Sequence, residues 1–146
     1  MEIRAVTYNE VKAVLSLIDE LKNASFSRPN DHQIASIYLS LIESGGCVVG
    51  AFINGELVGT CTVNMCSNFS WSGRPFAIIE NVIVSKKHRN CGVGKAVLGF
   101  ARDFAEKAGC YKVALMTGSK KESTHKFYES AGFVGNKTGF QIRFDA

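Results

Sequence analysis

The chain lacks any long hydrophobic run. None of its apolar segments approaches the roughly 18 residues that a membrane-spanning helix needs. The amino-terminal stretch, Met1-Glu2-Ile3-Arg4, lacks the apolar core of a secretory signal peptide. We therefore expect a cytoplasmic protein with no membrane partner.

The sequence is also poor in the patterns that build metal sites. Its three histidines and five cysteines form neither a Cys-x-x-Cys nor a His-x-x-x-His pattern. An odd number of irregularly spaced cysteines is typical of reduced thiols rather than of a disulfide framework. We expect five free thiols and no metal.

Positive charge is present only in modest excess, with a formal net charge of +4. A nucleic-acid binder is usually more basic and strings its charges along one element. Here the densest basic run, Lys86 to Arg89, falls between a predicted strand and a predicted helix. That position favours a small phosphate ligand, so we expect no nucleic-acid partner.

What is present is a regular succession of strand and helix patterns over one domain, residues 1–146. There is no linker, internal repeat or low-complexity segment. Helices are predicted near residues 10–22, 31–44, 93–108 and 123–131, and strands near 2–6, 47–53, 56–65, 76–85 and 111–117, with two more in the tail 133–145. The order βααβββαβαββ predicts an α/β protein, a mixed sheet with helices on both faces.

One stretch organises the rest of the chain. The apolar strand before Ser85 enters a basic turn, Arg89-Asn90-Cys91-Gly92-Val93-Gly94-Lys95, which leads into a helix. The first N–H groups of a helix are unpaired and can hold phosphate. Gly92 and Gly94 remove Cβ atoms that would block such a ligand, and the neighbouring cations supply countercharge.

The spacing of the turn excludes two common phosphate-binding loops. A Walker loop needs Ser or Thr where Ala96 stands, and a dinucleotide fingerprint needs a small third residue where Val97 stands. What remains, Arg-x-x-Gly-x-Gly, resembles the pyrophosphate-binding turn of the GNAT superfamily of acyl-CoA-dependent N-acetyltransferases. The predicted element order matches the GNAT fold along the whole chain.

A second signature supports the resemblance. The segment from Leu115 to Phe133 carries Phe127-Tyr128 and Gly132-Phe133, as the family often does thirteen residues or more after the strand leucine. The chain departs from the family at Lys121, where an asparagine commonly helps to hold the pantetheine arm. The resemblance still implies acetyl-CoA as cosubstrate, with Lys121 beside it.

The resemblance also implies where acetyl-CoA binds. The strand edge at Val82, Ile83 and Val84 would hold pantetheine by strand-like hydrogen bonds, and the Val82 N–H would face the oxyanion. The residues implied for the pyrophosphate are Arg89, Asn90, Cys91, Gly92, Val93, Gly94 and Lys95.

Glu80 and Tyr128 are the candidate catalytic residues. An alkylammonium has a pKa of about 10.4, so a nearby carboxylate is needed to take its proton. Glu80 interrupts an apolar strand and matches the family's general base, although a structural pairing with a lysine is the alternative. Tyr128 matches the family's general acid, and a core aromatic is its alternative. Cys91, a conceivable nucleophile, has no obvious partner residue.

The acceptor is the least defined part. In the family, the acceptor pocket is lined by loops whose counterparts in this chain contain Phe26, Arg28, Trp71 and Arg74. Two arginines suit an anionic acceptor. The stretches Gly109–Lys112, Lys126–Glu129 and Gln141–Arg143 resemble the glucosamine-6-phosphate N-acetyltransferases, where an arginine matching Arg143 contacts the sugar phosphate. However, those enzymes have Asp where this chain has Asn81.

These patterns predict an N-acetyltransferase that moves the acetyl group of acetyl-CoA to a small-molecule primary amine, by direct attack in a ternary complex. Three alternatives for the function stay open: an aminosugar-phosphate acceptor, a protein or peptide amine, and a non-catalytic acyl-CoA-binding module. For the assembly, a homodimer is the candidate.

Overall fold

The computed structural model describes residues 1–21 and 27–145 of the chain. Along the sequence the elements are β1 (Glu2–Ala5), α1 (Val11–Leu21), α2 (Asp31–Glu43), β2 (Cys47–Ile53), β3 (Glu56–Cys66), β4 (Phe76–Val84), α3 (Val93–Lys107), β5 (Val113–Leu115) and α4 (Glu122–Ser130). The five strands form one sheet in the order β1-β2-β3-β4-β5. Only β4 and β5 pair in parallel. The predicted α/β mixed sheet is confirmed.

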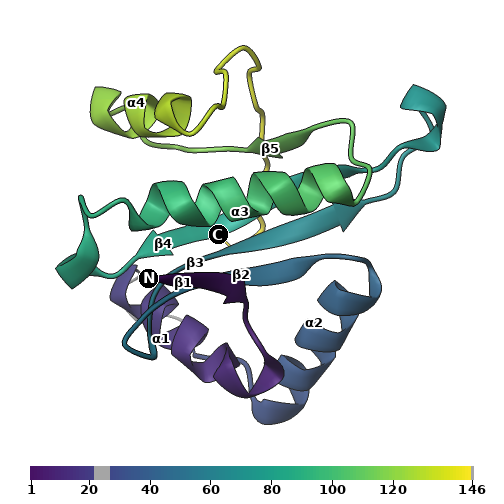
Figure 1. The fold of residues 1–146 in the computed structure, drawn as a ribbon. Coiled ribbons are helices and arrows are strands. Elements are labelled where there is room, and N and C mark those ends of the chain that lie inside the picture. Colours follow the sequence, from purple (N-terminus) through teal and green to yellow (C-terminus); the bar gives the residue numbers. More distant parts are fainter. Residues whose placement is uncertain (22–26, 146) are drawn as a thin grey trace.

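The sheet separates two layers of helices, with α1 and α2 on one face and α3 and α4 on the other (Figure 1). Successive side chains of β2 point to opposite faces of the sheet, so the strand contributes to the cores on both faces. Val49 and Ala51 belong to the core beneath α3, whereas Val48 and Phe52 belong to the core beneath α1.

Local sequence signals set the ends of the elements around the site. Asn30 starts α2 through a capping box, since its side chain accepts from the Gln33 N–H while the Gln33 side chain accepts from the Asn30 N–H, both at 2.8 Å. Asn54 and Gly55 join β2 to β3 with φ angles of 51° and 79°, which is the left-handed pair that a two-residue hairpin needs.

The tail is where the predicted order is wrong. Residues 133–145 form neither of the two predicted strands, and the chain runs past β5 as irregular backbone (Figure 1). A strand needs a partner for its backbone groups, and β5 offers only three residues at the edge of the sheet. Residues 133–144 pair with no strand of the described chain, and Phe140, Ile142 and Phe144 are 92%, 82% and 93% exposed.

Candidate active site

A β-bulge in β4 creates the centre of the site. Thr62 of β3 lies opposite Glu80, and Thr60 lies opposite Ile83, so two residues of β4 face one residue of β3. Asn81, within the bulge, has a φ of 55°. The alternation of β4 shifts there by one residue. Before the bulge Ile79 packs beneath α3, and after it Val82 does so while Ile83 faces α1.

The bulge turns two consecutive polar residues toward the same face. Glu80 and Asn81 both line a groove of about 700 Å³ between the sheet and the helices α1 and α2. The Glu80 side chain is exposed and makes no hydrogen bond or ion pair with any residue in the described part of the chain. The alternative of a structural pairing with a lysine is therefore not what this structure contains.

Sequence reasoning did not predict the bulge, although a signal was present. A strand with one buried face alternates polar and apolar residues, and the adjacent pair Glu80-Asn81 breaks that alternation in an otherwise apolar run. Asparagine is one of the few non-glycine residues that tolerates the left-handed region.

Replacing Asn81 should test the bulge. Asn81→Val should destabilise the fold by about 1–2 kcal/mol, because a β-branched residue strains at positive φ. Asn81→Gly is the matched control, since glycine adopts this conformation freely. Thermal melts of both variants give the comparison, and equal melting temperatures would show that the backbone at this position carries no strain.

The parallel pairing of β4 with β5 stops early. It ends at Ile79 opposite Leu115, whereas β4 continues to Val84. Among the described residues, the β5-facing edge of Val82, Ile83 and Val84 therefore has no strand beside it. A free edge presents N–H and C=O groups in a row, which can pair with an extended ligand that carries amides.

The glycine turn follows directly on this edge. A 3₁₀ turn at Lys86–His88 leads to Gly92, whose φ of 80° caps the start of α3. The first hydrogen bond of the helix runs from the Ala96 N–H to the Gly92 carbonyl at 3.1 Å. The N–H groups of residues 93–95 are therefore free of helical partners, and the exposed cations Arg89 and Lys95 flank them.

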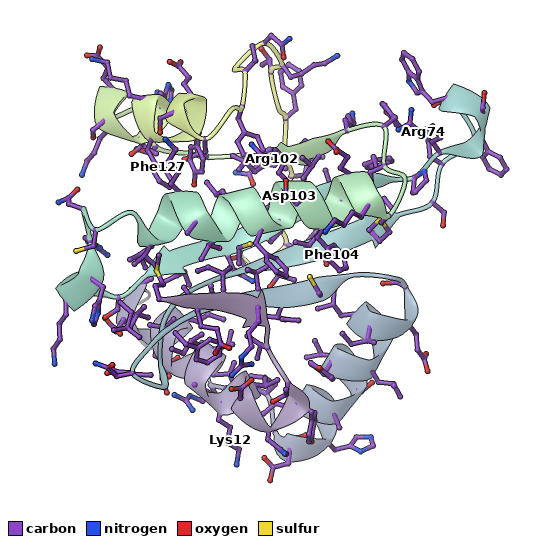
Figure 2. All side chains as sticks on the ribbon, viewed as in Figure 1. Lys12, Arg74, Arg102, Asp103, Phe104 and Phe127 are labelled. Carbon is purple, nitrogen blue, oxygen red and sulfur yellow. The ribbon has the colours of Figure 1, made fainter. Side chains whose placement is uncertain are left out.

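The two glycines of the turn have different roles. A Cβ on Gly92 would meet nothing within 4 Å, so this position leaves room for a ligand. A Cβ on Gly94 would lie 2.8 Å from the Phe127 ring, so Gly94 allows α4 to approach α3. Figure 2 shows Phe127 pointing from α4 toward the amino-terminal half of α3. The missing Cβ of Gly94 thus serves packing.

Tyr128 is held on α4 by aromatic neighbours. Its ring centroid lies 5.1 Å from that of Phe127 and 6.4 Å from that of Phe133. Burial, with a smaller contribution from Cys61, raises the pKa of the Tyr128 phenol above its usual value. The phenol is therefore protonated at neutral pH and able to donate. Lys121 is the exposed residue that precedes α4, and its N–H donates to Ser119 Oγ at 3.2 Å.

The residues considered for an anionic acceptor are dispersed. Arg28 pairs with Asp19 at 2.7 Å. Arg74 donates to the backbone carbonyls that follow α3 and lies at the opposite end of α3 from the glycine turn (Figure 2). Trp71 stacks on Tyr111 at 5.1 Å. Arg143 pairs with Asp145 in the tail. None of these four lines the groove that contains Glu80, and Phe26 lies outside the described residues.

The five cysteines are unpaired and differ in accessibility. Cys91 in the glycine turn is exposed. Burial raises the pKa of Cys47 to about 11 and, with a smaller contribution from Cys47, that of Cys61 to about 12. A thiol reacts as its thiolate, so the two buried groups should be inert in the folded protein.

Thiol titration of the native protein should therefore show one fast site. We expect Cys91 to react first with a disulfide reagent, and Cys91→Ser to remove this fast phase. Coenzyme A should slow the reaction if the turn holds its pyrophosphate. Cys66 is partly exposed and should react more slowly. Fast labelling of Cys47 or Cys61, located by mass spectrometry, would contradict their burial.

Two kinds of feature are absent from residues 1–21 and 27–145. Within these ranges no group of three or more His, Cys, Asp or Glu side chains is arranged to hold a metal ion. No helix in the same ranges has the length and apolar character required to cross a membrane.

A free strand edge that runs into a helix start with unpaired N–H groups suits an extended ligand that carries phosphate. The family model of the Acetyltransferase (GNAT) family matches residues 12–133. The chain belongs to this family and is an acetyltransferase. The predicted family and fold are confirmed.

Relatives with known names extend along most of the chain. A glucosamine 6-phosphate N-acetyltransferase of Trypanosoma brucei brucei is 28% identical over 99% of this chain and 95% of its own length. A streptothricin acetyltransferase of Escherichia coli is 32% identical over 63% of this chain and 49% of its own length. A solved chain from Agrobacterium tumefaciens str. C58, named as a candidate acetyltransferase, is 35% identical with a TM-score of 0.89 and covers 99% of this chain and 100% of its own.

Proposed function

We propose that the protein transfers the acetyl group of acetyl-CoA to the primary amine of a small molecule, by direct attack in a ternary complex. One observation carries the proposal: β4 and the turn after it bring a candidate base, a free strand edge and a helix start with unpaired N–H groups into one continuous segment. Glu80 lies in the groove, the unpaired edge follows at Val82 to Val84, and the anion-binding turn comes next.

The reaction divides among these parts as follows. Pantetheine extends along the free edge of β4, and the pyrophosphate binds the N–H groups at the start of α3. The amine enters from the groove and gives its proton to Glu80, directly or through water. The nitrogen then attacks the thioester carbon, and the Val82 N–H stabilises the oxyanion. The C=O bond then re-forms and the C–S bond breaks as Tyr128 gives a proton to the departing thiolate. The second proton of the nitrogen passes through water to the Tyr128 phenolate, which leaves the amide neutral and restores the phenol.

The direct test is a screen of primary amines with acetyl-CoA, in which thiol release and the mass of the N-acetyl product are both measured. We expect amine-dependent release of coenzyme A with some members of the panel. Binding of acetyl-CoA without turnover of any amine would instead identify a non-catalytic binding module.

Tyr128→Phe should reduce turnover about 10- to 100-fold and leave acetyl-CoA affinity nearly unchanged. The loss is moderate because a thiol has a pKa of about 8.5, so the thiolate leaves with limited help. The ring contacts with Phe127 and Phe133 persist in the variant. Initial rates and calorimetry give the two quantities, and equal turnover would assign Tyr128 to packing alone.

We also propose that two copies associate through the tail. Phe140, Ile142 and Phe144 alternate as in a strand, and all three are more than four-fifths exposed. The neighbouring edge of β5 is free, so a second copy offers both a strand edge and an apolar surface. Light scattering should give the mass of a dimer, and Phe140→Glu with Phe144→Glu should give a monomer. A monomeric parent protein would refute this assembly.

A further inference from the structure

The groove in front of Glu80 has an unusual balance of charge for an acceptor site. Seventeen described residues line it, and Glu80 is the only charged one among them. Its walls include five aliphatic side chains of α1 and α2, namely Val11, Leu15, Ile18, Ile37 and Leu41, with serine and threonine side chains among them. The groove therefore presents one negative charge on its floor between mainly apolar walls.

Three polar side chains of the walls are committed to the backbone. The Tyr38 hydroxyl donates to the Val6 carbonyl at 3.1 Å, and Ser44 Oγ donates to the Leu41 carbonyl at 2.9 Å. The side chain of Asn64 donates to the Ile78 carbonyl at 3.3 Å. The side chains of Ser36, Ser40, Thr62 and Asn81 make no hydrogen bond within the described residues, so the groove can accept a few polar groups but offers them no positive charge.

A phosphate group fits this groove poorly. A phosphate monoester carries a charge of about −1.5 to −2 at pH 7, because its second pKa is about 6. In the groove it would meet Glu80 and no cation among the described residues. Arg28 lines an adjoining hollow that shares Pro29, Ser36 and Ile37 with the groove, and its guanidinium is paired with Asp19. Arg74 binds the carbonyls of Gly109 and Cys110, and Arg143 binds Asp145.

We propose that the acceptor is a primary amine on an apolar, uncharged body, such as an alkylamine or arylalkylamine, rather than a phosphorylated amino sugar. Glu80 receives the ammonium group, and the aliphatic walls of α1 and α2 receive the body. This inference rests on the proposed function and assigns a substrate class that differs from the one named for the Trypanosoma relative.

A series of straight-chain alkylamines tests this assignment against glucosamine 6-phosphate. Each methylene that enters the groove should raise kcat/KM about three- to fourfold, as expected for burial of one CH₂ group. Glucosamine 6-phosphate should be at least tenfold poorer than hexylamine. A flat alkylamine series, or a preference for glucosamine 6-phosphate, would overturn the inference while leaving acetyl transfer established. Failure of every amine would overturn the proposed function and the inference together.

Two matched substitutions in α2 test whether the body of the acceptor lies in the groove. Ile37 lines the groove and is 58% exposed, and Leu39 is 56% exposed but does not line it. Ile37→Lys should lower kcat/KM for hexylamine at least tenfold and improve that for glucosamine 6-phosphate, and Leu39→Lys should change neither. Equal effects of the two substitutions would overturn the placement of the acceptor body in this groove. Because both side chains are largely exposed, neither variant threatens folding.

Discussion

Replacing Glu80 by glutamine should lower turnover about 10²- to 10⁴-fold at pH 7, the usual contribution of a positioned general base. Glutamine keeps the size and the hydrogen-bonding capacity of the side chain and removes its basicity. Because Glu80 makes no pairing with the described residues, its loss should leave the melting temperature unchanged. The measurement is kcat as a function of pH, alongside a thermal melt.

The pH dependence separates catalysis from structure. The acceptor amine has a pKa of about 10.4, so its neutral fraction rises about tenfold with each pH unit below that value. The variant should therefore recover much of its activity at high pH, when the amine no longer needs a base. A pH-independent loss with a matching fall in melting temperature would falsify the assignment of Glu80 as the base.

Gly92→Asp should weaken acetyl-CoA binding by at least about 100-fold. The new side chain would enter open space in front of α3, where the pyrophosphate is proposed to lie. Two unit charges about 4 Å apart repel by about 4 kcal/mol at an effective dielectric constant of 20. Calorimetry with acetyl-CoA measures the effect.

Gly92→Asn is the matched control for this change. The φ of Gly92 is 80°, and asparagine tolerates the left-handed region better than most residues. Asparagine also has the size of aspartate without its charge, so the control variant should keep most of its affinity. Unchanged affinity in Gly92→Asp would place the pyrophosphate elsewhere. Gly94 is unsuitable for this test, because any side chain there would clash with Phe127.

Much of the fold was predictable because its signals are local. The Asn54-Gly55 turn and the capping residue Asn30 act through neighbouring residues, so the sequence contains all the information they need. The tail was not predictable in this way. Its alternation is typical of strands, but whether Phe140 and Phe144 pair depends on an edge that only tertiary or quaternary structure supplies.

In the candidate site, too, some features depend on local sequence and others on tertiary contacts. The anion-binding turn follows from two glycines at a helix start, and the structure has this geometry at Gly92. The direction of Glu80 depends on the bulge at Asn81, which exists only relative to β3. Likewise, Gly94 was interpreted as room for a ligand, but its neighbour is Phe127 from a helix about thirty residues later. Long-range packing therefore decides which residues face the site.

The central claim is that acetyl transfer takes place directly, between acetyl-CoA on the free edge of β4 and an amine in the groove beside Glu80. Initial rates of coenzyme A release, measured while both substrates are varied, test it most directly. A ternary complex predicts intersecting lines in double-reciprocal plots, with Cys91→Ser retaining the activity of the parent. Parallel lines in the parent protein, together with loss of activity in Cys91→Ser, would indicate an acetyl-cysteine intermediate and would contradict the claim.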